Sequence, residues 1–251
     1  MLRLHQVRCY SAKQCLAEVD QIELHAKQFF ALLGPNGAGK TSLLKAISGD
    51  ANYTGKAEFH GKALSHWLPL DRARHLGVLP QNSTLNFPFS AAEVVAMGLT
   101  PLSLTRQEGN QQIKLKMQQT HCAHLADQPY PSLSGGEKQR VHLARVLLQV
   151  SQAEQAPLLL LDEPTSAQDL GQQHQILELI KNLCHQQEYG VLAILHDLNQ
   201  VLRYCDSCGV MWQGKLDAKG PPEEVLVAET IQRYWQYQPQ IISGEQHKVI
   251  V

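Results

Sequence analysis

A glycine-rich segment, Gly34 to Thr41, constrains this chain more than any other feature of its sequence. It follows the apolar run Phe29–Leu33 and precedes a stretch typical of a helix, Ser42–Ile47. A strand that ends in such a turn and then opens a helix points successive backbone N–H groups inward, and the positive end of the helix dipole adds to their attraction for an anion. An ordinary glycine-rich turn is the alternative, but the strand and the helix lie where a phosphate-binding loop requires them.

The segment matches the pattern G-x-x-x-x-G-K-[ST], which binds the phosphates of a nucleotide. In this pattern Lys40 reaches the β- and γ-phosphates, and the Thr41 hydroxyl binds Mg²⁺. We therefore predict a site for a nucleotide and Mg²⁺. The residues expected to contact the nucleotide are Gly34, Pro35, Asn36, Gly37, Ala38, Gly39, Lys40, Thr41 and Ser42.

A second apolar run, Leu158–Leu161, ends in two carboxylates, Asp162 and Glu163. This pattern is typical of a buried parallel strand, and ligands of open α/β sheets bind at the carboxyl ends of such strands. We expect Asp162 to hold Mg²⁺, directly or through water. Because successive strand residues alternate faces, Glu163 is predicted to point elsewhere and to act as a general base on water. A surface acidic pair is the alternative, which the phosphate loop disfavours.

Two further polar side chains follow predicted strands. His196 follows Val191–Leu195, and Gln81 follows Leu76–Leu79. Beside a bound nucleotide, a histidine at this position could hydrogen-bond the γ-phosphate or hold water, and a glutamine could touch both Mg²⁺ and the attacking water. A lone histidine is usually structural, and Gln81 alone would carry no meaning. Both are candidates for catalysis because they accompany the phosphate loop.

The segment Leu133–Arg140 opens a helix that is predicted to be buried, because Val141, Ala144 and Leu148 lie on one apolar face. Ser134, Gly135 and Gly136 at its start leave backbone N–H groups unpaired, which predicts a second anion site of the same physical type. One nucleotide cannot easily use both sites of one chain if they lie far apart. A flexible N-cap is the alternative reading of this stretch taken alone.

The remaining segments fit the same α/β plan. Partial alternation predicts strands at Arg3–Val7, Val19–Leu24 and Lys56–His60, with a turn at Asn52–Gly55 before the third. Tyr10 lies between the first two strands, where an exposed aromatic ring could stack on a nucleobase or could simply be packed.

Several features of the second half of the sequence stay open or minor. Residues 102–128 favour a helix over a strand, and His247–Val251 indicates a short strand. A capping box of Ser90 and Glu93 predicts a helix over Ala91–Met97. Phe87 and Phe89, on either side of Pro88, could anchor a core or form a docking surface. Asp169 is expected to cap the following helix.

Composition excludes some classes of function. The formal net charge of the 251 residues is −1, which gives no electrostatic signal for nucleic acid or an acidic membrane surface. No apolar stretch approaches the roughly 20 residues that a membrane-spanning helix needs, and Met1–His5 lacks the apolar segment of a secretory signal. We therefore expect a cytosolic protein.

The six cysteines are scattered, and Cys205–Cys208 is the only C-x-x-C. A second pair at zinc-ribbon spacing is missing, so free thiols are the favoured interpretation and a metal or redox site is the alternative. His121-Cys122-Ala123-His124 also suggests ligands, but it is interpreted as part of a solvated helical face.

Taken in order, these motifs resemble the ATP-binding subunit of an ABC transporter over essentially the whole chain. The set comprises the phosphate loop, Gln81, Leu133–Glu137, Leu158–Glu163, Ser166-Ala167-Gln168-Asp169 and His196. A phosphate loop alone occurs in many nucleotide hydrolases, whereas the Leu-Ser-Gly-Gly motif in this order does not. The resemblance implies a single α/β domain over residues 1–251. It combines a RecA-like core, an N-terminal antiparallel β subdomain and a helical subdomain inserted at about residues 90–150.

The resemblance also implies a homodimer, in which each ATP lies between the phosphate loop of one chain and Ser134, Gly135 and Gly136 of the other. In that arrangement Glu163 polarises the attacking water, His196 contacts the γ-phosphate, Gln81 senses Mg²⁺ and Tyr10 stacks on adenine. Two positions depart from the family pattern. Gln168 replaces the usual leucine, and Tyr10 is about one residue from the usual spacing.

Within that family, three segments resemble the ATPase of bacterial haemin importers. They are Asn86–Gly98, His196–Asn199 and Gly220–Leu226. Ferric-siderophore and cobalamin importers share the last two, and an exporter ATPase would share every nucleotide motif. The resemblance implies a peripheral subunit at the cytoplasmic face of the inner membrane. Its partners would be a permease dimer and, indirectly, a periplasmic haem-binding protein, with Phe87 and Phe89 in the docking surface and no nucleic acid.

Overall fold

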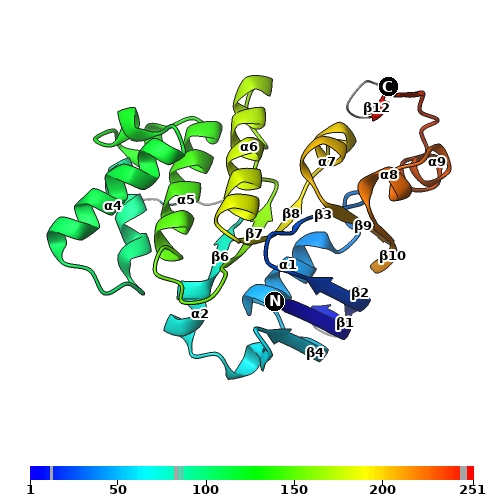
Figure 1. Cartoon of the computed structure of the whole chain (residues 1–251), viewed down its shortest axis with the longest axis horizontal. Coiled ribbons are helices and arrows are strands. Elements are labelled where there is room, and N and C mark those ends of the chain that lie inside the picture. The colour runs from blue at the N-terminus through cyan, green and yellow to red at the C-terminus, as the bar shows by residue number, and fades with distance from the viewer. Residues whose placement is uncertain (12–13, 82–84, 86, 244–247) are drawn as a thin grey trace.

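The described residues form a ten-stranded sheet and a separate two-stranded hairpin near the C-terminus (Figure 1). The structure is a computed structural model that describes residues 1–251 except 12–13, 82–84, 86 and 244–247. The strands are β1 (Leu2–Ser11), β2 (Gln14–Leu24), β3 (Phe29–Leu33), β4 (Tyr53–Phe59), β5 (Lys62–Ala63), β6 (Leu76–Leu79), β7 (Leu158–Asp162), β8 (Gly190–Ile194), β9 (Ser207–Trp212), β10 (Lys215–Gly220), β11 (Ile241–Ser243) and β12 (Lys248–Ile250). The α-helices are α1 (Lys40–Ser48), α2 (Pro69–His75), α3 (Ala91–Ala96), α4 (Arg106–Gln119), α5 (Gly135–Gln149), α6 (Leu170–Gln186), α7 (Leu198–Tyr204), α8 (Pro222–Val225) and α9 (Ala228–Trp235).

Strands β9, β3, β8, β7 and β6 are neighbours in this order and run parallel. β3, β7 and β8 are buried along their whole length, as expected for parallel strands that are covered on both faces. Their carboxyl ends meet at one edge of the sheet. The phosphate loop after β3, the two carboxylates at the end of β7 and His196 after β8 are therefore brought to the same edge.

Alternate residues of β3 enter two different cores. Phe29, Ala31 and Leu33 pack in a cluster with side chains of α5 and α6, whereas Phe30 and Leu32 pack in a cluster with side chains of α1. This alternation follows from the two-residue period of a strand. It places α1 on one face of the sheet and α5 and α6 on the other. The helix that follows the phosphate loop is therefore packed against the sheet through its apolar side chains.

The antiparallel part of the sheet is larger than the sequence indicated. β1 pairs with both β2 and β4. β1 extends beyond the predicted Arg3–Val7, and β2 extends beyond the predicted Val19–Leu24. The turn predicted at Asn52–Gly55 is wrong for its last three residues, which belong to β4. Gly55 has a φ of +93°, and a side chain there would meet the carbonyl of Gln6. The glycine serves a bulge between the strands, where the register shifts.

Every element between Ala91 and Gln149 is helical, and α4 and α5 lie away from the antiparallel strands β1, β2 and β4 in Figure 1. A third core joins these helices and contains Cys122. The helix expected within residues 102–128 is confirmed as α4. The interpretation of residues 121–124 as part of a solvated helical face is right for the exposure of His121, Ala123 and His124 but wrong for Cys122 and for the helix at His121. His121 has a φ of +54° and follows the helix, and Cys122 is fully buried.

The capping box of Ser90 and Glu93 is confirmed at the start of α3, where the Glu93 N–H donates to Ser90 Oγ at 3.2 Å. Phe89 packs against the third core, whereas Phe87 remains 67% exposed. Phe89 therefore anchors a core, and Phe87 is exposed as a docking surface requires, so its role in docking stays a prediction. At the C-terminus the expected short strand is confirmed as β12, although His247 lies outside the described residues.

Candidate functional site

The carboxyl edge of the parallel strands carries a cavity of about 750 Å³. It brings together residues from five places in the sequence. The cavity is lined by Leu16, Asn36, Gly37, Ala38, Gly39, Lys40, Thr41, Ser42, Gln81, Glu163 and His196. Seven of the nine residues predicted in and beside the phosphate loop, including Lys40, therefore face the same space as Gln81, Glu163 and His196.

The backbone of the phosphate loop explains why its glycines are needed. Gly34, Gly37 and Gly39 have φ values of +132°, +78° and +96°, a region that L-residues with side chains rarely adopt. A side chain at Gly39 would also meet the carbonyl of Leu16. α1 starts directly after Gly39 without a side-chain cap, so its first N–H groups face the cavity and can bind an anion.

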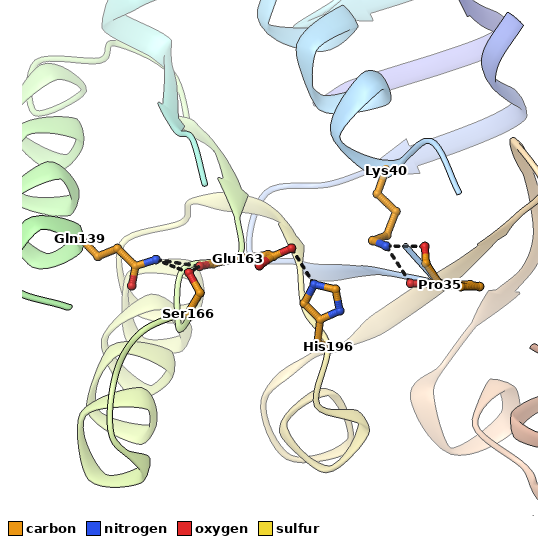
Figure 2. A network of polar contacts seen from close by, with 7 residues as sticks. Pro35, Lys40, Gln139, Glu163, Ser166 and His196 are labelled. Carbon is orange, nitrogen blue, oxygen red and sulfur yellow. Dashed lines mark hydrogen bonds and ion pairs between the residues drawn. The ribbon is translucent and has the colours of Figure 1, made fainter. Parts of the chain in front are cut away.

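Lys40 is held inside the loop by its own carbonyl groups. Its Nζ donates to Gly34 O at 2.7 Å and to Pro35 O at 2.9 Å, as Figure 2 shows for Pro35. Gly34 and Pro35 thus support Lys40 rather than line the cavity. Burial lowers the pKa of the Lys40 amine, because the charged form loses hydration. A phosphate group would restore a charged partner at this position.

Asp162, the last residue of β7, is buried. Burial raises the pKa of its carboxyl, and a hydrogen bond from the Thr41 hydroxyl opposes that shift. Among the described residues, Asp162 Oδ1 has no hydrogen-bond partner. A buried carboxylate oxygen without a partner, next to a threonine hydroxyl, is a donor set that suits a hard cation such as Mg²⁺.

Glu163 and His196 form a close pair at the cavity. His196 Nε2 lies 2.6 Å from Glu163 Oε1 (Figure 2). The His196 side chain is 47% exposed and the Glu163 side chain is 19% exposed. The prediction that strand alternation turns Glu163 away from Asp162 is wrong in its reason. Glu163 lies just beyond β7 with a φ of +53°, so a left-handed backbone conformation sets its direction.

Sequence reasoning missed the residues that hold Glu163 in this conformation. Gln139 of α5 donates through Nε2 to Glu163 O at 3.0 Å and to Ser166 Oγ at 2.5 Å, and Figure 2 shows both contacts. The Ser166 hydroxyl also donates to Glu163 O at 3.0 Å. A glutamine on a helix carries no signal for this role, because the contact is made only when α5 packs beside the end of β7.

The second predicted anion site does not share the nucleotide cavity. Ser134 caps α5, and its hydroxyl and N–H both donate to Glu137 Oε2, at 2.7 and 2.8 Å. Gly135 lines a smaller cavity of about 140 Å³, which also contains Gln81. A side chain at Gly135 or Gly136 would lie 3.0 Å from Ala167. These glycines let the segment that follows Glu163 pack closely on α5.

Comparison with known proteins places this site in a family. A sequence model described as ABC transporter matches residues 18–166. The chain is 47% identical over 243 residues to the hemin import ATP-binding protein HmuV of Shewanella denitrificans, with 96% of each chain covered. It is also 47% identical over 229 residues to the hemin import ATP-binding protein HmuV of Vibrio cholerae, covering 91% of this chain and 88% of that one. This chain belongs to the ABC transporter family.

Solved structures agree on the fold of this ABC cassette. A metal-chelate type ABC transporter in an inward-facing conformation superposes with a TM-score of 0.80 at 24% identity, covering 100% of this chain and 96% of that one. An ATP-binding cassette solved as a dimer with ADP and Pi superposes with a TM-score of 0.77 at 22% identity, covering 88% and 99%. No helix among the described residues is long and apolar enough to span a membrane.

The two departures from the ABC pattern occupy distinct environments. Gln168 donates to Gln139 Oε1 at 3.0 Å and to Pro164 O at 3.3 Å, so the glutamine joins the hydrogen bonds that surround Glu163. Tyr10 lines a separate cavity of about 470 Å³, which shares Leu16 and Ser42 with the nucleotide cavity. It does not line the cavity of the phosphate loop itself. Of the residues around Gln81, positions 82–84 and 86 lie outside the described residues.

Proposed function

We propose that this chain is the ATP-hydrolysing subunit of an ABC importer that takes up hemin. The observation that carries the proposal is the convergence of the phosphate loop and the Glu163–His196 pair on one cavity. The buried Asp162 is hydrogen-bonded to Thr41, which lines that cavity. The family supplies the chemistry of this cavity, and the two hemin import relatives cover at least 91% of the chain. Energy from ATP would drive a separate permease.

The chain offers suitable groups for MgATP. The N–H groups at the start of α1 would bind the phosphates, and Lys40 would exchange its two carbonyl partners for phosphate oxygens. Asp162, Thr41 and Gln81 would hold Mg²⁺, and the buried Asp162 Oδ1 without a partner supports this assignment. Bound there, Mg²⁺ neutralises charge that develops on the phosphates. Tyr10 would contact adenine from the neighbouring cavity.

Glu163 would act as the general base. Its Oε1 lies 2.6 Å from His196 Nε2, so the imidazole holds the carboxylate at the cavity while the second carboxylate oxygen accepts a proton from the attacking water. His196 is 47% exposed and can also donate to the γ-phosphate. Lys40 would neutralise charge on the γ-phosphate. Gln81 would contact both Mg²⁺ and the attacking water.

Two copies of the chain would form each complete site. Ser134, Gly135 and Gly136 begin a helix but lie outside the nucleotide cavity of their own chain. A head-to-tail homodimer would place them on the triphosphate of the partner. We further propose that this homodimer binds a permease dimer at the cytoplasmic face of the inner membrane, where the exposed Phe87 would contribute to docking. A periplasmic haem-binding protein would deliver cargo.

The hydrolysis step is tested by Glu163→Gln, which removes the base and keeps the size of the side chain. Nucleotide binding should remain at the wild-type level, and kcat should fall about 10²-fold or more. Glu178→Gln on α6 is the matched control, because Glu178 is exposed and does not line the cavity. Hydrolysis by Glu163→Gln near the wild-type rate would show that another group activates the water.

The cargo is tested in proteoliposomes that contain the chain, the permease encoded beside its gene and the cognate binding protein. Hemin on the binding protein should stimulate ATP hydrolysis, whereas a ferric siderophore or cobalamin should not. Stimulation by one of the other two compounds would assign the chain to that importer. An exporter ATPase would respond to none of the three loaded binding proteins.

A further inference from the structure

A group of possible metal-ligand atoms lies near the amino ends of the parallel strands, away from the nucleotide cavity at their carboxyl ends. Cys184 and His185 lie in the last turn of α6, and Asp206 lies between α7 and β9. Phe29, which starts β3, donates its N–H to Asp206 Oδ2 at 2.7 Å. Because the phosphate loop follows the other end of β3, this group lies across the sheet from the ATP cavity.

The three side chains present sulfur, nitrogen and oxygen to one small volume. Cys184 Sγ, a ring nitrogen of His185 and a carboxylate oxygen of Asp206 all lie within 4.8 Å of one another. His185 Nε2 is 3.1 Å from Asp206 Oδ2. The His185 and Asp206 side chains are 36% and 37% exposed, while Cys184 is buried beneath them. An ion could therefore meet the imidazole and the carboxylate from solvent, whereas the fully buried Cys184 would have to move toward it.

These distances come close to those of a tetrahedral site, although the sulfur has to move. Zinc binds nitrogen and oxygen at about 2.0–2.2 Å and sulfur at about 2.3 Å, so the ligand atoms of a tetrahedral site lie roughly 3.3–3.6 Å apart. The 3.1 Å between His185 Nε2 and Asp206 Oδ2 is close to that spacing. The largest separation in the group, at most 4.8 Å, requires the sulfur to approach by little more than an ångström.

We propose that Cys184, His185 and Asp206 form a binding site for a borderline divalent transition metal ion of the Zn²⁺ class, with solvent as the fourth ligand. One thiolate, one imidazole and one carboxylate suit such an ion and disfavour Mg²⁺, which takes oxygen ligands. The site ties the end of α6 to the start of β3 through the Phe29 N–H on Asp206. It does not depend on the function proposed for the ATP cavity.

Binding must displace a proton. Burial raises the pKa of the Cys184 thiol to about 12, so the thiol is protonated in the metal-free protein. The ion forms a metal–sulfur bond, the S–H proton leaves to water, and no electrons are transferred. The site should therefore bind metal more tightly as the pH rises.

Cobalt titration tests the site directly, because Co²⁺ bound to a thiolate gives a near-ultraviolet charge-transfer band that Co²⁺ on oxygen and nitrogen ligands lacks. The chain should be free of nucleotide and treated with chelator. It should carry Cys15→Ser, since Cys15 is an exposed thiol. We expect the thiolate band at one equivalent of Co²⁺ and its loss on addition of Zn²⁺.

Variants assign the ligands. His185→Gln should weaken Co²⁺ binding about tenfold or more. Losing a residue that only hydrogen-bonds a metal ligand already costs about that much affinity, so losing a ligand should cost at least as much. His174→Gln is the matched control on α6, because His174 bonds to Tyr204, and its affinity should match the parent. Cys184→Ser should abolish the band while circular dichroism shows a folded chain.

Three results would overturn the proposal. The first is the absence of a thiolate band, which would leave His185 and Asp206 as a surface hydrogen-bonded pair. The second is equal Co²⁺ affinity in the parent and in His185→Gln. The third is a band that survives Cys184→Ser and disappears in Cys205→Ser, since Cys205 is the neighbouring thiol whose pKa Cys184 also influences.

Discussion

Replacing Gln139 by alanine should slow ATP hydrolysis although Gln139 does not line the nucleotide cavity. Its amide makes three hydrogen bonds: two donated, to Glu163 O and Ser166 Oγ, and one accepted from Gln168 Nε2. Together they enclose the backbone of Glu163, whose φ is +53°. A left-handed conformation costs about 1–2 kcal/mol for a residue with a side chain, so the surrounding contacts must maintain it.

The expected losses follow from these contacts. Each part-buried hydrogen bond contributes about 1 kcal/mol, and Glu163 O keeps its bond from Ser166. Because the substitution removes three such bonds, we expect Gln139→Ala to lower the free energy of unfolding by about 2–3 kcal/mol. The greater effect should fall on kcat, because a displacement of the base by about 1 Å costs on the order of 10²-fold in rate. The affinity for ATP should not change, since the phosphate loop is untouched.

The assay is steady-state ATP hydrolysis together with nucleotide binding and urea unfolding. Gln149→Ala is the matched control on the same helix, because Gln149 also donates twice, to Ala73 O at 2.8 Å and Leu76 O at 3.2 Å. It should lower stability by a similar amount and leave kcat unchanged. If both variants lose stability equally and Gln139→Ala keeps the wild-type kcat, the idea that Gln139 positions Glu163 is refuted.

Other predictions concern pH, the C-terminus and the loop. Burial lowers the pKa of His142 from 6.5 to about 4. The unfolded chain therefore binds this proton more readily than the folded chain. As the pH falls through the unfolded pKa, the free energy of unfolding should decrease by about 2 kcal/mol between about pH 7 and about pH 5. Urea midpoints should show this slope, and His142→Gln should reduce it. Asn199→Ala breaks two hydrogen bonds to Ile250. Hydrogen exchange in β12 should accelerate while ATP hydrolysis is kept. Gly39→Ala should abolish ATP binding, because a side chain there meets Leu16 O, and unchanged affinity in a calorimetric titration would contradict this.

Local patterns predicted the central part of the fold because each one has a local physical cause. The run Phe29–Leu33 is buried on both faces, and the structure confirms it as β3. Asp169 was expected to cap a helix and does so by accepting from the Gln172 N–H at 2.9 Å. The prediction of a turn at Asn52–Gly55 was wrong because the cause there is a contact with a segment distant in sequence. Gly55 serves a bulge against β1, and the partner strand lies 49 positions away from it in sequence at Gln6.

The sequence alone determined that the chain binds a nucleotide, because the glycines, Lys40 and Thr41 are contiguous and their chemistry requires only one strand, one turn and one helix. It also named Glu163 and His196, 33 positions apart. Tertiary structure decided what those residues contact. The pairing of Glu163 with His196, and the support from Gln139, exist only because parallel strands and α5 bring distant segments to one edge. Packing geometry of that kind is set by the whole core and by no single segment.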